Sequence, residues 1–140
     1  MSDVALTKFK FEHIGMIEDA VGRQLMPLTE AVHLERYDTS FTAFDGDRVI
    51  GCAGLIPIWK NRYIAWAHVD TDAFAKNKVW AIRTIKRYLD MVEGRVEAAV
   101  PEAFEEGFRL AKALGFRVEC VLAEKYFANG TDARLYVRIN

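Results

Sequence analysis

Apolar residues recur along this chain with two periods, and each period predicts one type of element. Alternation over Ala5–Phe11 predicts a first strand, because successive side chains of a strand point to opposite faces. Helical spacing of the apolar residues over His13–Val21 predicts a short helix that ends at Gly22. Pro27 is suited to open a second helix, since a first turn does not need the donor that proline lacks. The apolar residues of that second helix are Leu28, Val32, Leu34 and Tyr37.

The middle of the chain predicts an antiparallel meander. Asp45-Gly46 is a tight-turn signal, and the long apolar run after it begins with β-branched residues. Gly51 and Gly54 weaken the interior of a strand, so they indicate a bulge or a close packing contact. The predicted strands are Ser40–Phe44, Arg48–Ile58 and Arg62–Val69, with a second turn at Lys60-Asn61.

Two more helices and further strands are predicted in the C-terminal half. An apolar stripe at helical spacing predicts a long helix over Phe74–Val92. A helix over Glu102–Leu114 has acidic residues in its first turns, where they suit the helix dipole, and Gly115 suits its C-terminal cap. The remaining predicted strands are Arg95–Val100, Phe116–Tyr126 and Ala133–Ile139, with a turn at Asn129-Gly130 between the last two.

This order of elements, β-α-α-β-β-β-α-β-α-β-β, predicts an α/β fold of the α+β type with a mixed sheet. The strand–helix–strand unit that ends with Arg95–Val100 should be parallel, and the final hairpin should be antiparallel. The chain has 140 residues, which is the size of one domain, so we expect a single domain over residues 1–140.

Composition narrows the function classes. The formal net charge of −1 gives no electrostatic case for nucleic acid or an anionic membrane as a partner. The N-terminal residues lack a signal-peptide pattern and no segment is long and apolar enough to span a bilayer, so we expect a soluble, cytoplasmic protein. Cys52 and Cys120 stand in apolar stretches and are interpreted as small buried hydrophobes, although a disulfide between them stays open. No group of cysteine and histidine residues has the spacing of a metal site.

One local sequence carries a family resemblance. Ala111-Lys112-Ala113-Leu114-Gly115-Phe116-Arg117 resembles the segment of GNAT N-acetyltransferases in which the fourth helix ends at Leu-Gly-Phe and leads into the sixth strand. The Asp-Gly hairpin and the run through Gly51-Cys52-Ala53-Gly54 also resemble that family, and the predicted order of elements matches its fold. A narrower resemblance, over Tyr37–Val69 and Phe108–Tyr126, is to small GNAT-like proteins of short-tailed phages, including the internal virion protein A group.

The GNAT resemblance implies acetyl-CoA as cosubstrate, with its diphosphate on backbone N–H groups at the start of the third helix. Free amides and a positive dipole end suit an anion. The matching stretch, Val69 to Lys78, contains none of the glycines that the family uses there. Asp70 and Asp72 are candidates for capping the helix instead. The candidate cofactor-binding residues are Val69, Asp70, Thr71, Lys76, Asn77 and Lys78.

The acid and base that the resemblance implies need replacements in this chain. Ala111 stands where many family members have a tyrosine that protonates the leaving thiolate, and alanine cannot donate a proton. His68 is the candidate base, because its reference pKa is near neutral; the alternative interpretation is a histidine satisfied by neighbouring backbone. Tyr126 is the candidate acid, and Tyr88 is a second one.

Two functions are compatible with these residues, and both stay open. The first is an N-acetyltransferase that moves an acetyl group from acetyl-CoA to an amine or protein acceptor. The second is a catalytically degenerate GNAT-like phage protein that acts in virion assembly or host interaction, since fold alone does not fix function. A homodimer or a phage or host protein is the protein partner to be considered.

Overall fold

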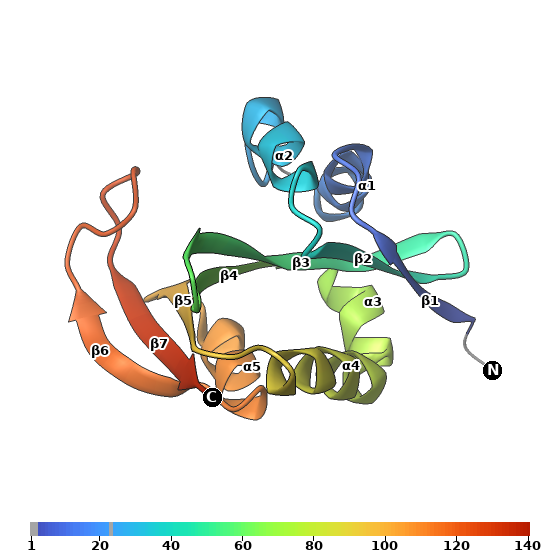
Figure 1. Cartoon of the computed structure of the whole chain (residues 1–140). Helices are drawn as coiled ribbons and strands as arrows, with labels where there is room; N and C mark the ends of the chain where they lie inside the picture. The colour runs from blue at the N-terminus through green and yellow to red at the C-terminus, as the bar shows by residue number, and fades with distance from the viewer. Residues whose placement is uncertain (1–2, 23) are drawn as a thin grey trace. The chain divides into compact units, whose positions relative to one another are not determined.

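The computed structural model describes residues 3–22 and 24–140 (Figure 1). Within this part of the chain the helices and strands follow one another in nearly the predicted order. The elements are β1 (Val4–Lys8), α1 (Glu12–Val21), α2 (Leu28–Glu35), β2 (Ser40–Asp45), β3 (Arg48–Trp59), β4 (Arg62–Val69), α3 (Thr71–Lys76), α4 (Lys78–Asp90), β5 (Arg95–Pro101), α5 (Glu105–Ala113), β6 (Arg117–Ala123) and β7 (Ala133–Ile139).

Over the residues that the structure describes, the strands form one mixed sheet of seven in the order β1-β2-β3-β4-β5-β7-β6. β4 and β5 pair in parallel, with Arg62 opposite Arg95 and Ile64 opposite Glu97. The β1–β2, β2–β3, β5–β7 and β6–β7 pairs are antiparallel. The predicted mixed α/β class, the parallel unit and the final antiparallel hairpin are therefore confirmed.

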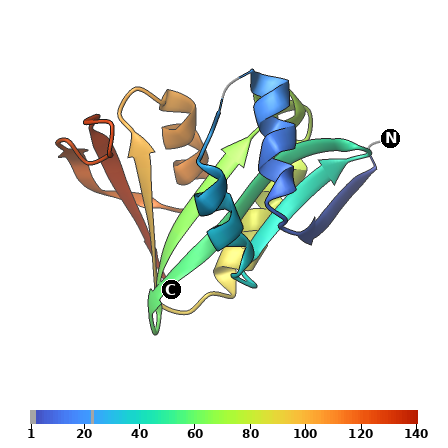
Figure 2. The same ribbon diagram turned by 90° about the horizontal axis from the view of Figure 1, so that it is seen from above.

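The chain divides into two compact units. The first holds the described residues up to Ile56 together with Ala65–Lys78, and the second holds Pro57–Ile64 and Val79–Asn140. In the first unit, α1 and α2 lie over one face of β2 and β3, as Figures 1 and 2 show. Its core is a cluster of buried side chains from the N-terminal segment, both helices and the meander: Phe9, Ile14, Ile17, Met26, Ala31, Leu34, Val49 and Cys52.

In the second unit, α5 packs on the strands through an aromatic pair and a cation–π contact. The rings of Phe108 and Tyr136 lie 6.1 Å apart, and the guanidinium of Arg134 lies 4.1 Å from the Phe108 ring. α5 ends at Ala113, and the turn after it contains Gly115, whose φ of 92° is the left-handed conformation that favours glycine. The Asn140 side chain donates to the carbonyl oxygens of Leu89 and Val92, at 2.7 and 2.6 Å, and so ties Asn140 to the last turn of α4 and to the segment just after it.

The predicted long helix over Phe74–Val92 is wrong, because the chain forms two helices that meet at Asn77. The backbone N–H of Asn77 donates to the Phe74 carbonyl at 3.0 Å, and its side chain donates to the Ala73 carbonyl at 2.9 Å. The side chain thus takes an acceptor that a continuing helix would give to a backbone N–H. The periodicity of the apolar residues does not register this break.

Several predicted boundaries are also corrected. β1 ends at Lys8 and not at Phe11, because Phe11 is already the residue that precedes α1. β6 ends at Ala123, so Tyr126 lies in the loop that follows it. α5 begins at Glu105 and not at Glu102, since the Glu102 N–H donates to the Asp132 carbonyl. In α2 the buried residues are Ala31 and Leu34, whereas Leu28 and Val32 are exposed.

Candidate functional site

A bulge in β3 fixes the end of β4. Ala43 pairs with Gly51 and Phe44 pairs with Val49, so Ile50 is an extra residue between them. The Ile50 carbonyl accepts a hydrogen bond from the N–H of Asp70 at 3.0 Å. The bulge therefore sets the point at which the chain leaves β4 and enters α3.

Gly51 allows β3 and β4 to approach closely beside this bulge. A Cβ on Gly51 would lie 2.9 Å from both the His68 carbonyl oxygen and Val69 Cγ1, which is too close for a side chain. Gly54 likewise has no room for a Cβ, which would lie 2.7 Å from the Thr39 carbonyl oxygen. Of the two predicted alternatives, a bulge or a close packing contact, the close contact explains both glycines, and the bulge lies at Ile50 next to Gly51.

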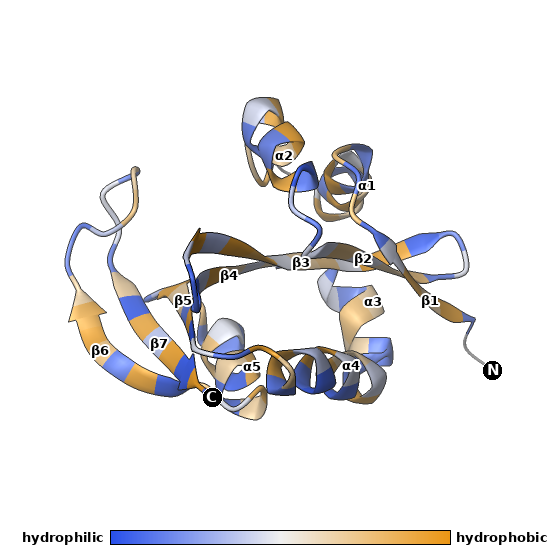
Figure 3. Cartoon of the chain, in the orientation of Figure 1, coloured by the Kyte–Doolittle hydropathy of each residue, from blue (hydrophilic) through white to orange (hydrophobic). Residues whose placement is uncertain are grey.

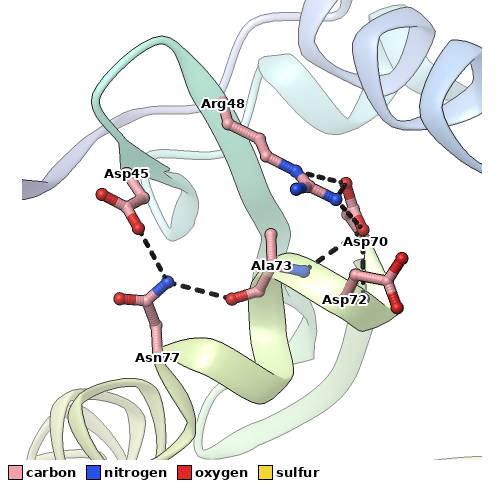
Figure 4. Close-up of polar contacts among 6 residues, drawn as sticks. All are labelled: Asp45, Arg48, Asp70, Asp72, Ala73 and Asn77. Carbon is pink, nitrogen blue, oxygen red and sulfur yellow. Dashed lines mark hydrogen bonds and ion pairs between the residues drawn. The ribbon is translucent and has the colours of Figure 1, made fainter. Parts of the chain in front are cut away.

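The start of α3 is closed by the chain's own carboxylate. Asp70 Oδ1 accepts hydrogen bonds from the N–H groups of Asp72 and Ala73, at 3.2 and 3.3 Å (Figure 4). Arg48 reaches the same carboxylate with two atoms: Nε is 3.0 Å from Oδ2, and Nη2 is 3.0 Å from Oδ1. Asp70 is therefore the N-cap of α3 and one half of a bidentate ion pair.

Asp70 is only 3 % exposed, yet it stays ionised. Burial alone would raise the pKa of its carboxyl, but the hydrogen bonds from Arg48, Ala73 and Asp72 and the charge of Arg48 outweigh burial and lower that pKa below its ordinary value. The folded protein therefore stabilises the carboxylate form of Asp70.

The other end of α3 is fixed by the same hairpin. Asp45, at the end of β2, accepts a hydrogen bond at 3.1 Å from the side chain of Asn77, which is buried. Arg48 and Asp45 flank the turn between β2 and β3, a hydrophilic tip in Figure 3. One hairpin thus holds both ends of the six-residue helix, as Figure 4 shows. We call the set Asp45, Arg48, Asp70 and Asn77 the hairpin clamp.

The remaining predicted cofactor residues lie along this segment. Val69 is half-buried against Gly51, and Thr71 is exposed. Lys76 and Lys78 are both exposed, on either side of the buried Asn77 where α3 passes to α4. The six predicted residues are neighbours along the chain, and two of them, Asp70 and Asn77, are engaged in contacts within the protein.

His68 lies near the end of β4 in the first unit. Its ring is half-buried and lies 6.3 Å from the ring of Trp66, two residues earlier on the strand. Trp66 packs edge-on against the buried Phe9, with the ring centroids 5.2 Å apart. His68 is therefore a half-buried residue near the end of β4, with its ring beside that of Trp66.

Tyr126 belongs to the second unit, in the loop between β6 and β7. It is 50 % exposed, and its ring lies 5.3 Å from that of Phe127 at nearly a right angle. Ala111, at the position where the family uses tyrosine, is 6 % exposed and packs in the core of this unit. The proton donor that the resemblance implies is therefore absent from that position on α5.

Sequence reasoning missed the hairpin half of the clamp. Arg48 and Asp45 are separated from their partners by 22 and 32 residues, so no local pattern relates them. The available signal was the pair of opposite charges flanking the hairpin turn, which a turn alone does not require. These charges could have predicted that the hairpin makes polar contacts, but not that the contacts are with α3.

Neither a metal site nor a disulfide is found in the described ranges. Residues 3–22 and 24–140 hold no group of three or more metal-ligating side chains of the His, Cys, Asp or Glu type. Cys52 and Cys120 are free thiols; the first is buried and the second half-buried. Over the same residues no helix has the length and apolar character needed to cross a membrane.

Compared by sequence, the chain matches no protein-family model and no curated protein. Its structure is similar to that of a GNAT-family acetyltransferase from Bacillus anthracis, with a TM-score of 0.69, 14 % identity, and 97 % and 94 % of the two chains covered. It is also similar to the ribosomal-protein-S5-alanine acetyltransferase from Vibrio fischeri, with a TM-score of 0.71, 18 % identity, and 100 % and 97 % of the two chains covered.

A third similar structure is that of yncA from Salmonella typhimurium, solved with its cofactor acetyl-CoA. The TM-score is 0.69 at 13 % identity, and the match covers 97 % of this chain and 93 % of that one. None of these three structures comes from a phage, so they lend no support to the phage resemblance. The likeness extends over nearly the whole length of both chains in each comparison: this protein has the fold of the GNAT acetyltransferases.

Proposed function

We propose that the chain is an N-acetyltransferase that transfers the acetyl group of acetyl-CoA to an amine. The observation that carries this proposal is the likeness of the whole chain to acetyltransferase structures, one of them solved with acetyl-CoA. A second is described as acting on an alanine of a ribosomal protein, so a protein amine is one acceptor class to test. Fold alone does not establish activity, so the proposed activity also requires residues that hold acetyl-CoA and transfer protons.

The residues that fit a diphosphate lie where α3 passes to α4. Lys76 and Lys78 are exposed there and offer two ammonium groups to an anion. α4 begins at Lys78, and the first N–H groups of a helix have no partner within it. We therefore place the diphosphate at Lys76–Lys78, with the backbone of Val69 and Thr71 as the approach to it.

Acetyl-CoA, when bound, supplies the acetyl group as a thioester. We assign to His68 the role of base, which accepts the proton that the attacking amine must lose. Tyr126, which belongs to the second unit, keeps the role of candidate acid, because its phenol is half exposed and is able to donate a proton.

Isothermal titration calorimetry of the full chain with acetyl-CoA tests the proposal. We expect binding with a Kd of roughly micromolar order and a rise in melting temperature. The double variant Lys76→Gln/Lys78→Gln should bind about tenfold more weakly, since two phosphate-facing charges are lost. Lys86→Gln/Arg87→Gln, which removes two exposed charges further along α4, is the matched control and should bind as the wild type does. No heat at millimolar acetyl-CoA would refute the proposal.

Turnover is measured separately, as thiol release with peptide N-termini and polyamines as acceptors. His68→Gln and Tyr126→Phe should each lower kcat by about a hundredfold if they transfer protons. A second candidate function, binding without catalysis, is favoured by the buried Ala111. Binding of acetyl-CoA with no thiol release from any acceptor would select that second function.

A further inference from the structure

The contacts of Asp70 are those that an external anion would make at α3. Its Oδ1 lies 3.2 and 3.3 Å from the N–H nitrogens of Asp72 and Ala73, and Arg48 adds a two-atom contact from the hairpin. Two backbone amides and one arginine are a common set of phosphate donors. Here that set is already satisfied by a carboxylate of the chain itself.

A diphosphate could use these donors only by expelling Asp70. The carboxylate is almost completely buried, whereas the Arg48 side chain is half exposed. An incoming anion would therefore meet a like charge at the N–H groups, and the expelled carboxylate would lose three donors at once. The missing glycines add to this, because Asp70, Thr71 and Asp72 each carry a Cβ where the family's loop brings backbone close to phosphate.

The far end of α3 resists the same movement. Asn77 donates to both Asp45 and the Ala73 carbonyl, so shifting the helix to release Asp70 would also strain the contact with the hairpin. Figure 4 shows both contacts of the Ala73 backbone: its N–H donates to Asp70, and its carbonyl accepts from Asn77. The clamp therefore acts on the helix as a unit.

We infer that Asp70 is a built-in substitute for a cosubstrate diphosphate at α3, and that the Arg48–Asp70 pair stays closed when acetyl-CoA binds. The inference rests on the proposed function for its ligand, but it makes a separate claim about which amides are used. The diphosphate contacts then fall on the exposed lysines on either side of Asn77.

Two-dimensional ¹⁵N NMR of the full chain distinguishes the two claims. On titration with acetyl-CoA the N–H signals of Lys76 and Lys78 should shift, while those of Asp72 and Ala73 stay in place. Inorganic pyrophosphate alone should also leave Asp72 and Ala73 unmoved. Shifts of Asp72 and Ala73 that saturate with either probe would overturn the inference. If no signal moves with acetyl-CoA, the proposed function fails, and the claim that Asp70 occupies the α3 amides is then decided by pyrophosphate, which should leave Asp72 and Ala73 unmoved.

A pair of isosteric variants gives a second readout. Asp70→Asn can still cap the helix but loses the charge that Arg48 holds, so it would release the amides more readily. If Asp70 stays in place, the acetyl-CoA Kd of Asp70→Asn should match that of Asp72→Asn within about threefold, since each removes one nearby charge. Asp72 is exposed and serves as the matched control. Binding more than about tenfold tighter in Asp70→Asn alone would mean that ligand must displace Asp70.

Discussion

Replacing Asp70 is predicted to destabilise the protein more than replacing any other residue of the hairpin clamp. Asp70→Ala removes the N-cap of α3 and both oxygen acceptors of Arg48. Loss of a cap costs about 1 kcal/mol, and loss of a hydrogen bond to a charged group costs about 1.5–3 kcal/mol. Arg48 is half exposed, so water solvates it once it is unpaired and the cost of an isolated buried charge does not apply. We expect a fall in unfolding free energy of roughly 2–4 kcal/mol.

The matched variants separate the cap from the ion pair. Asp70→Asn keeps an N-cap of similar quality but removes the charge and replaces one of the two oxygens that accept from Arg48 by an NH2 donor, so it should lose the ion pair and cost about half as much as Asp70→Ala. Arg48→Gln should cost a similar amount, and a double-mutant cycle of Arg48→Gln with Asp70→Asn should show a coupling energy of about 1 kcal/mol in favour of the native pair. Urea denaturation at neutral pH measures the free energy of unfolding of the single and double variants.

The lowered pKa of Asp70 also fixes how the stability that Asp70 adds changes with pH. The pKa of Asp70 is lowered in the folded protein, so the stability it adds is complete above the pKa of an unfolded aspartate, about 3.9, and is lost as pH falls through the lower folded value. The difference between wild type and Asp70→Asn should therefore shrink in acid. Equal stability of wild type and Asp70→Ala at pH 7 would refute the reasoning, because the loss of the cap and of the ion pair must lower the free energy of unfolding.

Three further predictions concern the first unit. Gly51→Ala should lower stability by about 1–3 kcal/mol in urea denaturation, because the new Cβ would press on Val69; wild-type stability would contradict this close approach. Burial raises the pKa of Cys52 to about 12 despite a hydrogen bond with Thr42, so iodoacetamide at pH 8 should label Cys120 first in the native protein; equal labelling rates by mass spectrometry would count against that burial. Burial also lowers the pKa of His13, so the stability it adds is present above about pH 6.5 and declines as pH falls toward the folded pKa; His13→Asn should flatten this decline, and an unchanged pH profile would exclude the effect.

The meander and its hairpins were predictable from sequence because their signals are local. Asp45-Gly46 and Lys60-Asn61 both mark turns, and Gly46 and Asn61 adopt positive φ there, at 59° and 64°. Gly51 and Gly54 were correctly interpreted, since a glycine inside an apolar strand weakens it unless a bulge or a close backbone contact requires it. The preference of aspartate for the N-cap predicted capping by Asp70 or Asp72, and the structure shows that Asp70 is the cap.

What sequence reasoning could not supply was the partner of each polar group. The break at Asn77 depends on a side-chain bond to Ala73 and on Asp45, which lies 32 residues earlier. An apolar stripe with the right spacing continues across that break, so periodicity predicts one helix where the side-chain contacts make two. The role of Arg48 was not predicted either, because its contact with Asp70 forms only when the hairpin packs against α3.

A crystal structure of the chain grown with acetyl-CoA tests the central claim most directly. We predict electron density for the diphosphate beside Lys76 and Lys78, with both Arg48–Asp70 contacts unchanged at 3.0 Å. Density for the diphosphate on the N–H groups of Asp72 and Ala73, with the Asp70 side chain swung out to solvent, would contradict it.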